Sequence, residues 1–198
     1  MNIINKITEE VIKRSNDFQQ LTKGTKEEYN LYNEHIQYVY NNVIMLAKTN
    51  PVDLEVLQLS ALLHDISMTD KKLDRSKHNE YSALIAEELL KKYNYDNKKI
   101  NLIKKCILNH SNKRKDYRTT LEEQILVDAD SLSHFDNCLS IYSFAYNVLN
   151  LSEEESINYL KDKLTKDYNE MSKEIKNLVK DKYNKIINII NYKELKKD

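Results

Sequence analysis

The sequence of 198 residues contains one glycine, one proline and no tryptophan. Strands joined by tight turns usually need glycine or proline at those turns, so this scarcity argues against an all-β fold and favours helices with short polar connections. No apolar run approaches the roughly 20 residues that cross a bilayer, and the N-terminal segment carries acids where a signal peptide would be apolar. We therefore expect a cytoplasmic protein with no membrane partner.

Two further shortages concern net charge and cysteine. Lysine plus arginine and aspartate plus glutamate both total 31, so the formal net charge is zero. A protein that binds nucleic acid through its phosphates normally has a basic surplus, and we expect no stable nucleic-acid binding here. Cys106 and Cys138 are far apart and have no partners at metal-ligand spacing, which indicates free thiols in a reducing compartment.

Apolar residues recur near the helical period through most of the chain. Helices are expected over residues 3–20, 26–48, 51–66, 78–93, 97–110 and 120–135, with further helical sequence from 152 to about 192. The polar segments 67–77 and 111–120 are expected to be loops. The fold predicted is all-α, one compact domain over 1–198 with about seven to nine helices, a core over about 26–150 and a helical C-terminal extension over 151–198.

Three helix starts can be read from short signals. Asn50–Pro51 predicts a start, with asparagine as the N-cap and proline at the first helical position. Thr120 with Glu123, and Ser152 with Glu155, have the spacing of a capping box.

Acidic residues occur in two of the most apolar segments. Asp65 lies in ALLHDI, and Asp128 and Asp130 lie in ILVDADSL, with no lysine or arginine in either segment. A buried carboxylate is unfavourable by several kcal/mol unless its charge meets a partner, and a divalent cation would serve several at once. Two imidazoles, from His35 and His64, would complete a donor set suited to Mn, Fe, Co, Ni, Zn or Mg.

The order of these groups over residues 30–135 resembles the HD superfamily of metal-dependent phosphohydrolases. ALLHDI is similar to the signature helix end of that family, and HNEYSALIAEELL to the helix that follows it in small bacterial members. The resemblance implies a compact helical fold with His35, His64, Asp65 and Asp130 as metal ligands. The segment DADSLSHF departs from the family in having Ser133 where many relatives carry an acid.

His78 and His110 extend the resemblance to the six-ligand variant of the family. In that variant the two histidines hold a second metal, and the aspartate of the His-Asp pair, here Asp65, bridges both. The alternative is a single metal, with His78 and His110 protonated to bind phosphate or to act as an acid. The chain is thus expected to bind one or two divalent metal ions, with catalytic roles for Asp65, His78 and His110.

Other residues near these segments have less defined roles. Asp128 is either an alternative ligand or a support for one, and His134 is expected to support the site or to lie at the surface. Arg75, Lys113 and Arg114 flank the two later histidines and are candidates to bind a phosphate, although such charged stretches are usually solvated loops.

The resemblance implies hydrolysis of a phosphoester or phosphoanhydride of a nucleotide or small phosphorylated metabolite by metal-activated water. A phosphatase, a phosphodiesterase and a nucleotide pyrophosphatase all fit this description. Two alternatives remain, a di-iron oxygenase of the six-ligand subset and a catalytically silent regulatory module. The C-terminal helices either cover the core or pair with another subunit in a homodimer.

Overall fold

A computed structural model describes the backbone of residues 2–195, and the side chains of that range except at 112, 113, 115 and 192–195. This part of the chain is all-helical and contains no strand, so the expected helical bundle is confirmed. Nine α-helices follow one another: α1 (Ile3–Thr22), α2 (Gln37–Ala47), α3 (Leu54–Leu63), α4 (His78–Lys92), α5 (Asn97–Asn109), α6 (Leu121–Asp136), α7 (Cys138–Ser143), α8 (Glu153–Glu170) and α9 (Lys173–Leu195). None of these helices is both long and apolar enough to cross a membrane.

Short 3₁₀ and π-helical segments connect the α-helices. The 3₁₀ segments are Ile66–Thr69, Arg75–Lys77 and Asn112–Tyr117, and the π-helical segments are Tyr32–Ile36 and Phe144–Val148. They lie in or beside the two stretches that were expected to be loops, and directly before α2 and after α7.

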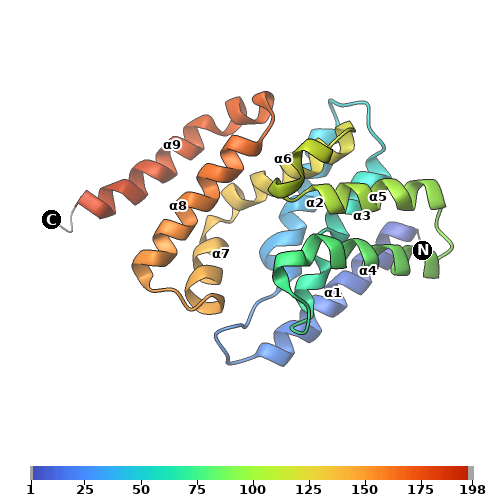
Figure 1. Ribbon diagram of the computed structural model, residues 1–198, viewed down its shortest axis with the longest axis horizontal. Coiled ribbons are helices and arrows are strands. Elements are labelled where there is room, and N and C mark those ends of the chain that lie inside the picture. Colours follow the sequence, from blue (N-terminus) through green and yellow to red (C-terminus); the bar gives the residue numbers. More distant parts are fainter. Residues whose placement is uncertain (1, 196–198) are drawn as a thin grey trace.

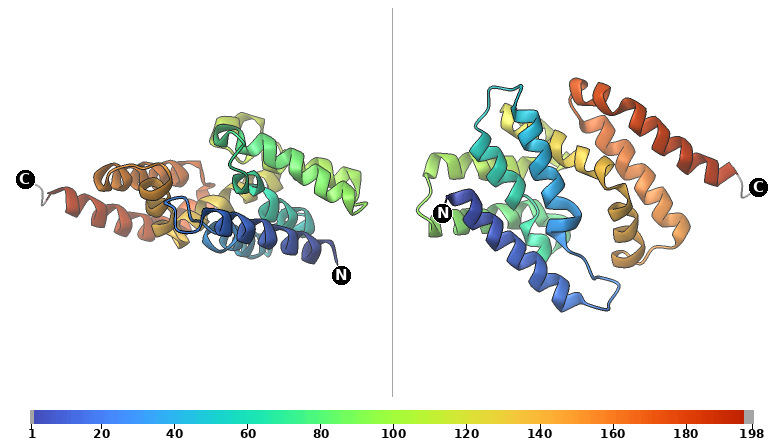
Figure 2. Two further views of the ribbon diagram at one scale, coloured as in Figure 1. Left: turned by 90° about the horizontal axis from the view of Figure 1, so that it is seen from below. Right: turned by 180° about the vertical axis from the view of Figure 1, so that it is seen from behind.

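The helices α7, α8 and α9 lie together at one end of the molecule, and α1, α4 and α5 lie at the other (Figure 1). Helices α2 and α6 pack against each other between these ends, and α6 also packs against α8. The two further views in Figure 2 show the same separation from below and from behind. Helix α6 therefore packs against helices from both ends, α5 on one side and α8 and α9 on the other.

Buried apolar side chains form two clusters that meet in the middle of the molecule. One cluster joins α2, α6, α8 and α9, through residues such as Val43, Leu126, Leu164 and Val179. The other joins α1, α3, α4 and α5, through residues such as Val11, Leu59, Leu90 and Ile103. Tyr40 and Leu102 pack against both clusters. The apolar faces of α1, α8 and α9 thus pack against the central helices.

The predicted helix starts have different outcomes. Both capping boxes, at Thr120 and at Ser152, are present with both of their reciprocal hydrogen bonds. The prediction of a helix start at Asn50–Pro51 is wrong, because α3 begins at Leu54. Asp53 is the N-cap, and its carboxylate accepts from two backbone N–H groups of the first turn. Asn50 instead donates to the carbonyl of Leu46 at the end of α2.

Candidate metal centre

Six of the side chains singled out in the sequence converge where several helices begin or end. They are His35 in the π-helical segment before α2, His64 and Asp65 just after α3, His78 at the first position of α4, His110 just after α5, and Asp130 within α6. A π-helical turn is rare and occurs most often at functional sites. Helix ends place these side chains at the edge of the core, where a cavity can reach them.

The carboxylate of Asp65 lies between two pairs of histidines. Its Oδ2 atom is 3.7 Å from the Nε2 atoms of both His35 and His64. Its Oδ1 atom is 3.6 Å from the Nε2 atoms of both His78 and His110. Oδ1 is buried and has no hydrogen-bond partner among the described residues. One aspartate is therefore placed to contribute an oxygen atom to each of two neighbouring groups of ligands.

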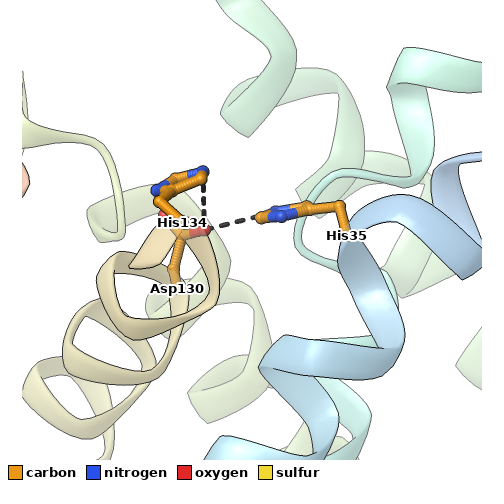
Figure 3. A group of neighbouring side chains, drawn as sticks. All are labelled: His35, Asp130 and His134. Carbon is orange, nitrogen blue, oxygen red and sulfur yellow. Dashed lines mark ion pairs between the residues drawn. The ribbon is translucent and has the colours of Figure 1, made fainter. Parts of the chain in front are cut away.

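Asp130 adds a second carboxylate to the first of these groups, and Figure 3 shows its ion pairs with His35 and His134. Its Oδ1 atom is 3.2 Å from Nε2 of His35 and 3.8 Å from Nε2 of His64. His134 lies one helical turn later, with its Nε2 atom 3.9 Å from the same oxygen, and its ring stacks on that of His35 with the centroids 5.2 Å apart. His134 is therefore part of the site, although the sequence left open whether it would lie at the surface.

Three of the histidines have their proton positions set by the backbone. The Nδ1 atoms of His64, His78 and His110 each face the carbonyl oxygen three residues earlier, at 2.8, 3.0 and 2.6 Å. A carbonyl oxygen only accepts, so each Nδ1 carries a proton and the neutral ring presents the lone pair of Nε2 to the site.

The fourth histidine has the same orientation through a side chain. Ser133 donates its hydroxyl proton to the carbonyl oxygen of Asp130 at 2.6 Å, so its Oγ atom accepts from Nδ1 of His35 at 3.2 Å. The Nε2 lone pair of His35 therefore also faces inward. Ser133, where the family resemblance led us to expect an acid, thus orients the ring of His35.

The inward-facing nitrogen atoms come closer than lone pairs tolerate without a cation. Nε2 of His35 is 3.0 Å from Nε2 of His64, and Nε2 of His78 is 3.2 Å from Nε2 of His110. A proton or a metal ion between each pair would remove the repulsion. Together with the unpartnered Asp65 oxygen, this donor set fits one divalent ion in each half.

The electrostatics keep both carboxylates ionised. Burial disfavours the charge of Asp65, but the surrounding histidines, His64 foremost, outweigh it and hold the pKa well below its usual range. Burial likewise opposes ionisation of Asp130, and His134 and His35 lower its pKa well below the ordinary value. Ionised carboxylates are the forms that bind a metal.

The pKa values of the histidines shift in two directions. Burial is the main cause that lowers the pKa of His64, and it lowers the pKa of His110 to about 4, which favours the neutral ligand form of both rings. For His35, burial also acts against the charged form, but the adjacent Asp130 outweighs it and raises the pKa. A proton or a cation is therefore favoured at the first half of the site.

A cavity of about 490 Å³ opens onto these groups. Its lining includes His35, Asp65, His78, His110, Asp130 and His134, while the His64 side chain is fully buried beneath them. Apolar side chains from the α7–α8 region cover part of the wall, namely Ile141, Phe144, Leu149 and Tyr159. The cavity is large enough for a small metabolite and combines an ionic floor with an apolar wall.

The three cationic candidates from the loops are placed differently. Arg75 lines the cavity, with its guanidinium carbon 5.7 Å from the centroid of the Phe144 ring. Arg114 donates from Nε to the side chain of Asn109 and lies over Tyr117, and it is absent from the described cavity lining. The side chain of Lys113 lies outside the described residues.

Asp128 has a partner away from the cavity. Its Oδ1 atom accepts from the backbone N–H of Ser172 at 2.8 Å and from Nε2 of Gln124 at 3.1 Å. Burial raises the pKa of this carboxyl above its ordinary value. Asp128 therefore connects α6 with the turn before α9.

Two residues of α8 reach the site without having been predicted. The Oδ2 atom of Asp167 is 2.9 Å from Nδ1 of His134, and the Nζ atom of Lys163 is 2.6 Å from Oδ1 of Asp167. Both residues line the cavity. In the sequence they look like one of many i, i+4 ion pairs on a charged helix, which usually face solvent.

These residues lie in a segment that matches a known protein family. The family model for the HD domain matches residues 32–134, which include all six convergent side chains and end at His134. An uncharacterized protein of Clostridium beijerinckii is 30% identical over 101 residues, a match that spans 51% of this chain and 60% of that protein.

A solved structure has a similar fold. It is the crystal structure of a predicted HD superfamily hydrolase from an uncultured Thermotogales bacterium, with a TM-score of 0.53 and 23% sequence identity. The similarity covers 79% of this chain and 84% of that one. It therefore supports the helical architecture beyond the segment that the family model matches.

Proposed function

The chain belongs to the HD domain family, and from that premise we propose that it is a metal-dependent phosphohydrolase. Its substrate is a nucleotide or another small phosphorylated metabolite, bound in the cavity above Asp65. Monoesters, diesters and phosphoanhydrides are all compatible with this chemistry.

The proposal depends mainly on one observation, the position of Asp65 between two histidine pairs. Four imidazoles turn their Nε2 atoms toward this carboxylate, and one of its oxygens is buried without a partner among the described residues. The Nδ1 atoms of the histidines are held by hydrogen bonds to the protein, while the Nε2 atoms turn toward one another and toward the two aspartates, which is the arrangement expected of metal ligands.

The donors divide into two ligand groups. His35, His64, Asp65 and Asp130 would hold one divalent ion, and His78 and His110 with Asp65 would hold a second. Bound divalent metal supplies a water of lowered pKa and neutralises charge that develops on the phosphate oxygens. If the second group holds no metal, His78 and His110 would instead bind the phosphate directly.

The protein contributes positioning and charge around this centre. Arg75, which lines the cavity, is oriented by its contact with Phe144 and has a planar fork that suits a phosphate group. The apolar residues of the α7–α8 wall restrict water and offer a surface to the non-phosphate part of the substrate. The cavity dimensions favour a small molecule over a polymer.

The test combines metal analysis with a substrate panel. The purified protein, loaded in turn with Mn, Fe, Co or Zn, is assayed for phosphate release from an aryl phosphate, nucleotides and phosphodiesters. We expect turnover that is lost in Asp65→Ala and kept in Asp181→Ala, which changes an exposed aspartate of α9. Oxygen consumption by an iron-loaded protein that releases no phosphate would favour the oxygenase instead. Bound metal with neither activity would favour a regulatory module.

A further inference from the structure

Helix α8 presents one face to the cavity, although it lies outside the segment that the HD model matches. Tyr159, Lys163, Lys166 and Asp167 all line the cavity, and their spacing places them on one side of the helix. The family match ends at residue 134, and α8 begins at Glu153. The helix packs against α6, which carries Asp130 and His134. The C-terminal extension therefore supplies part of the wall beside the metal ligands.

Lys163 is the most enclosed of the cations on this face. Its side chain is 30% exposed, and its Nζ atom lies 2.6 and 2.8 Å from the two oxygens of Asp167. The carboxylate of Asp167 is itself only 4% exposed. Burial disfavours the charged ammonium, but Asp167 and Asp130 together outweigh it and raise the pKa of Lys163. The lysine therefore stays cationic at the edge of the site.

The hydrogen-bond pattern leaves Lys163 with a free donor. Nδ1 of His134 lies 2.9 Å from Asp167 and 3.3 Å from Nζ of Lys163. One ring nitrogen cannot donate to the carboxylate and accept from the ammonium at the same time, and the shorter contact is to Asp167. An ammonium group has three donors, and Asp167 offers acceptors for two of them. The third N–H remains for a group in the cavity.

The position of Lys163 complements that of Arg75. Arg75 lines the cavity with its guanidinium carbon 5.7 Å from the centroid of the Phe144 ring, and its backbone carbonyl accepts from His78. Lys163 lies beside His134 and close enough to Asp130 to interact with it electrostatically. Cations thus line the cavity that reaches the donor set, as expected for a ligand that carries oxyanions.

We propose that Lys163, held in place by Asp167, is an anion-binding residue of the cavity and donates to a phosphate oxygen at the His35–Asp130 half of the centre. This inference deepens the proposed phosphohydrolase and rests on it for the identity of the anion. It makes α8 part of the substrate site as well as of the packed core.

The test uses inorganic phosphate as the probe, so that it does not depend on turnover. The affinity of the metal-loaded full chain for phosphate is measured by isothermal titration calorimetry, and metal content is measured in parallel. We expect Lys163→Met to weaken phosphate binding about tenfold or more with unchanged metal content, since a charge-assisted hydrogen bond is lost. Lys163→Arg should retain most of the affinity. Lys180→Met, at an exposed lysine of α9, should bind as the wild type does.

A double variant tests whether the effect of Lys163→Met comes from damage to the fold. Lys163→Met leaves the buried Asp167 without its cation, and Lys163→Met with Asp167→Asn removes both charges while an amide oxygen still accepts from His134. We expect the double variant to bind phosphate as weakly as the single one. Unchanged phosphate affinity in metal-loaded Lys163→Met, or no phosphate binding by the wild type, would overturn the inference. A wild type that binds phosphate through Lys163 but hydrolyses no phosphoester would uphold it while removing the proposed function.

Discussion

The Nδ1 atom of His35 lies 3.2 Å from the hydroxyl oxygen of Ser133, so a residue of α6 determines which nitrogen of a proposed ligand before α2 carries the proton. The hydroxyl is oriented by its own hydrogen bond to the carbonyl of Asp130. A small polar residue thereby couples two of the proposed metal ligands.

Ser133→Ala should weaken metal binding without removing a ligand. Loss of a hydrogen bond that orients a ligating histidine typically lowers metal affinity by about 10–100-fold. The measurement is a Mn or Zn titration of the apo protein, with Ser143→Ala as the control because Ser143 is exposed and its hydroxyl oxygen accepts from Asn147. Equal metal affinities in Ser133→Ala and the wild type would show that the hydroxyl does not orient His35.

His110→Ala should separate the two halves of the centre. It removes one donor of the His78–His110 group and leaves His35, His64 and Asp130 intact. We expect the metal content of a two-metal protein to fall to about one ion per chain by mass spectrometry of the native protein. His64→Ala should reduce binding at the other half. A wild type that binds a single ion, which His110→Ala retains, would instead favour the one-metal alternative.

Arg75→Gln and Arg114→Gln form a matched pair. Arg75 lines the cavity, whereas Arg114 is bonded to Asn109. Loss of a charge-assisted contact with phosphate should raise KM about tenfold in Arg75→Gln. Arg114→Gln should leave KM close to that of the wild type. Steady-state kinetics on the best substrate of the panel provides the measurement, and a larger KM effect at position 114 would contradict this assignment.

Glu123→Gln should destabilise the fold in a pH-dependent way. The Glu123 side chain is fully buried, and its carboxylate accepts from Asn109 at 2.6 Å and from the backbone N–H groups of Thr119 and Thr120. Burial alone would raise its pKa, but these hydrogen bonds outweigh it and lower the pKa below the ordinary value.

A lowered pKa in the folded state means that the stabilisation is complete above the ordinary glutamate pKa and is lost as the pH falls through the lower, folded-state value. At pH 7 we expect Glu123→Gln to lose about 1–3 kcal/mol of unfolding free energy. In urea unfolding the difference from the wild type should shrink below about pH 4. A difference that stays constant from pH 7 to pH 3 would contradict an ionised Glu123.

The sequence alone was sufficient for the features that depend on neighbouring residues. The scarcity of glycine and proline indicated helices, and the capping boxes at Thr120 and Ser152 are present as the spacing predicted. A capping box forms within one turn, so local sequence determines it. The helix start predicted at Asn50–Pro51 is wrong because Asp53, three residues after Asn50, is an equally suitable cap. In the structure the Asp53 carboxylate accepts from the N–H groups of the first turn.

For the candidate site, the unusual position of acids in apolar segments was visible in the sequence, and tertiary structure brings His35, His64, Asp65 and Asp130 within a few ångströms of one another. The orientation of Asp65 between the histidine pairs, and the difference between Arg75 and Arg114, could not be read from the chain. Charged side chains on two loops have the same features in the sequence, and only the tertiary packing determines which of them faces the cavity.

The contribution of α8 was decided by tertiary structure alone. Lys163 and Asp167 are separated from Asp130 by more than 30 residues and lie on a helix rich in charge, where most ion pairs are solvated. They reach the metal centre because the apolar face of α8, with Leu160 and Leu164, packs into the same cluster as α6. That packing places the ion pair beside His134, with the Asp167 side chain only 4% exposed.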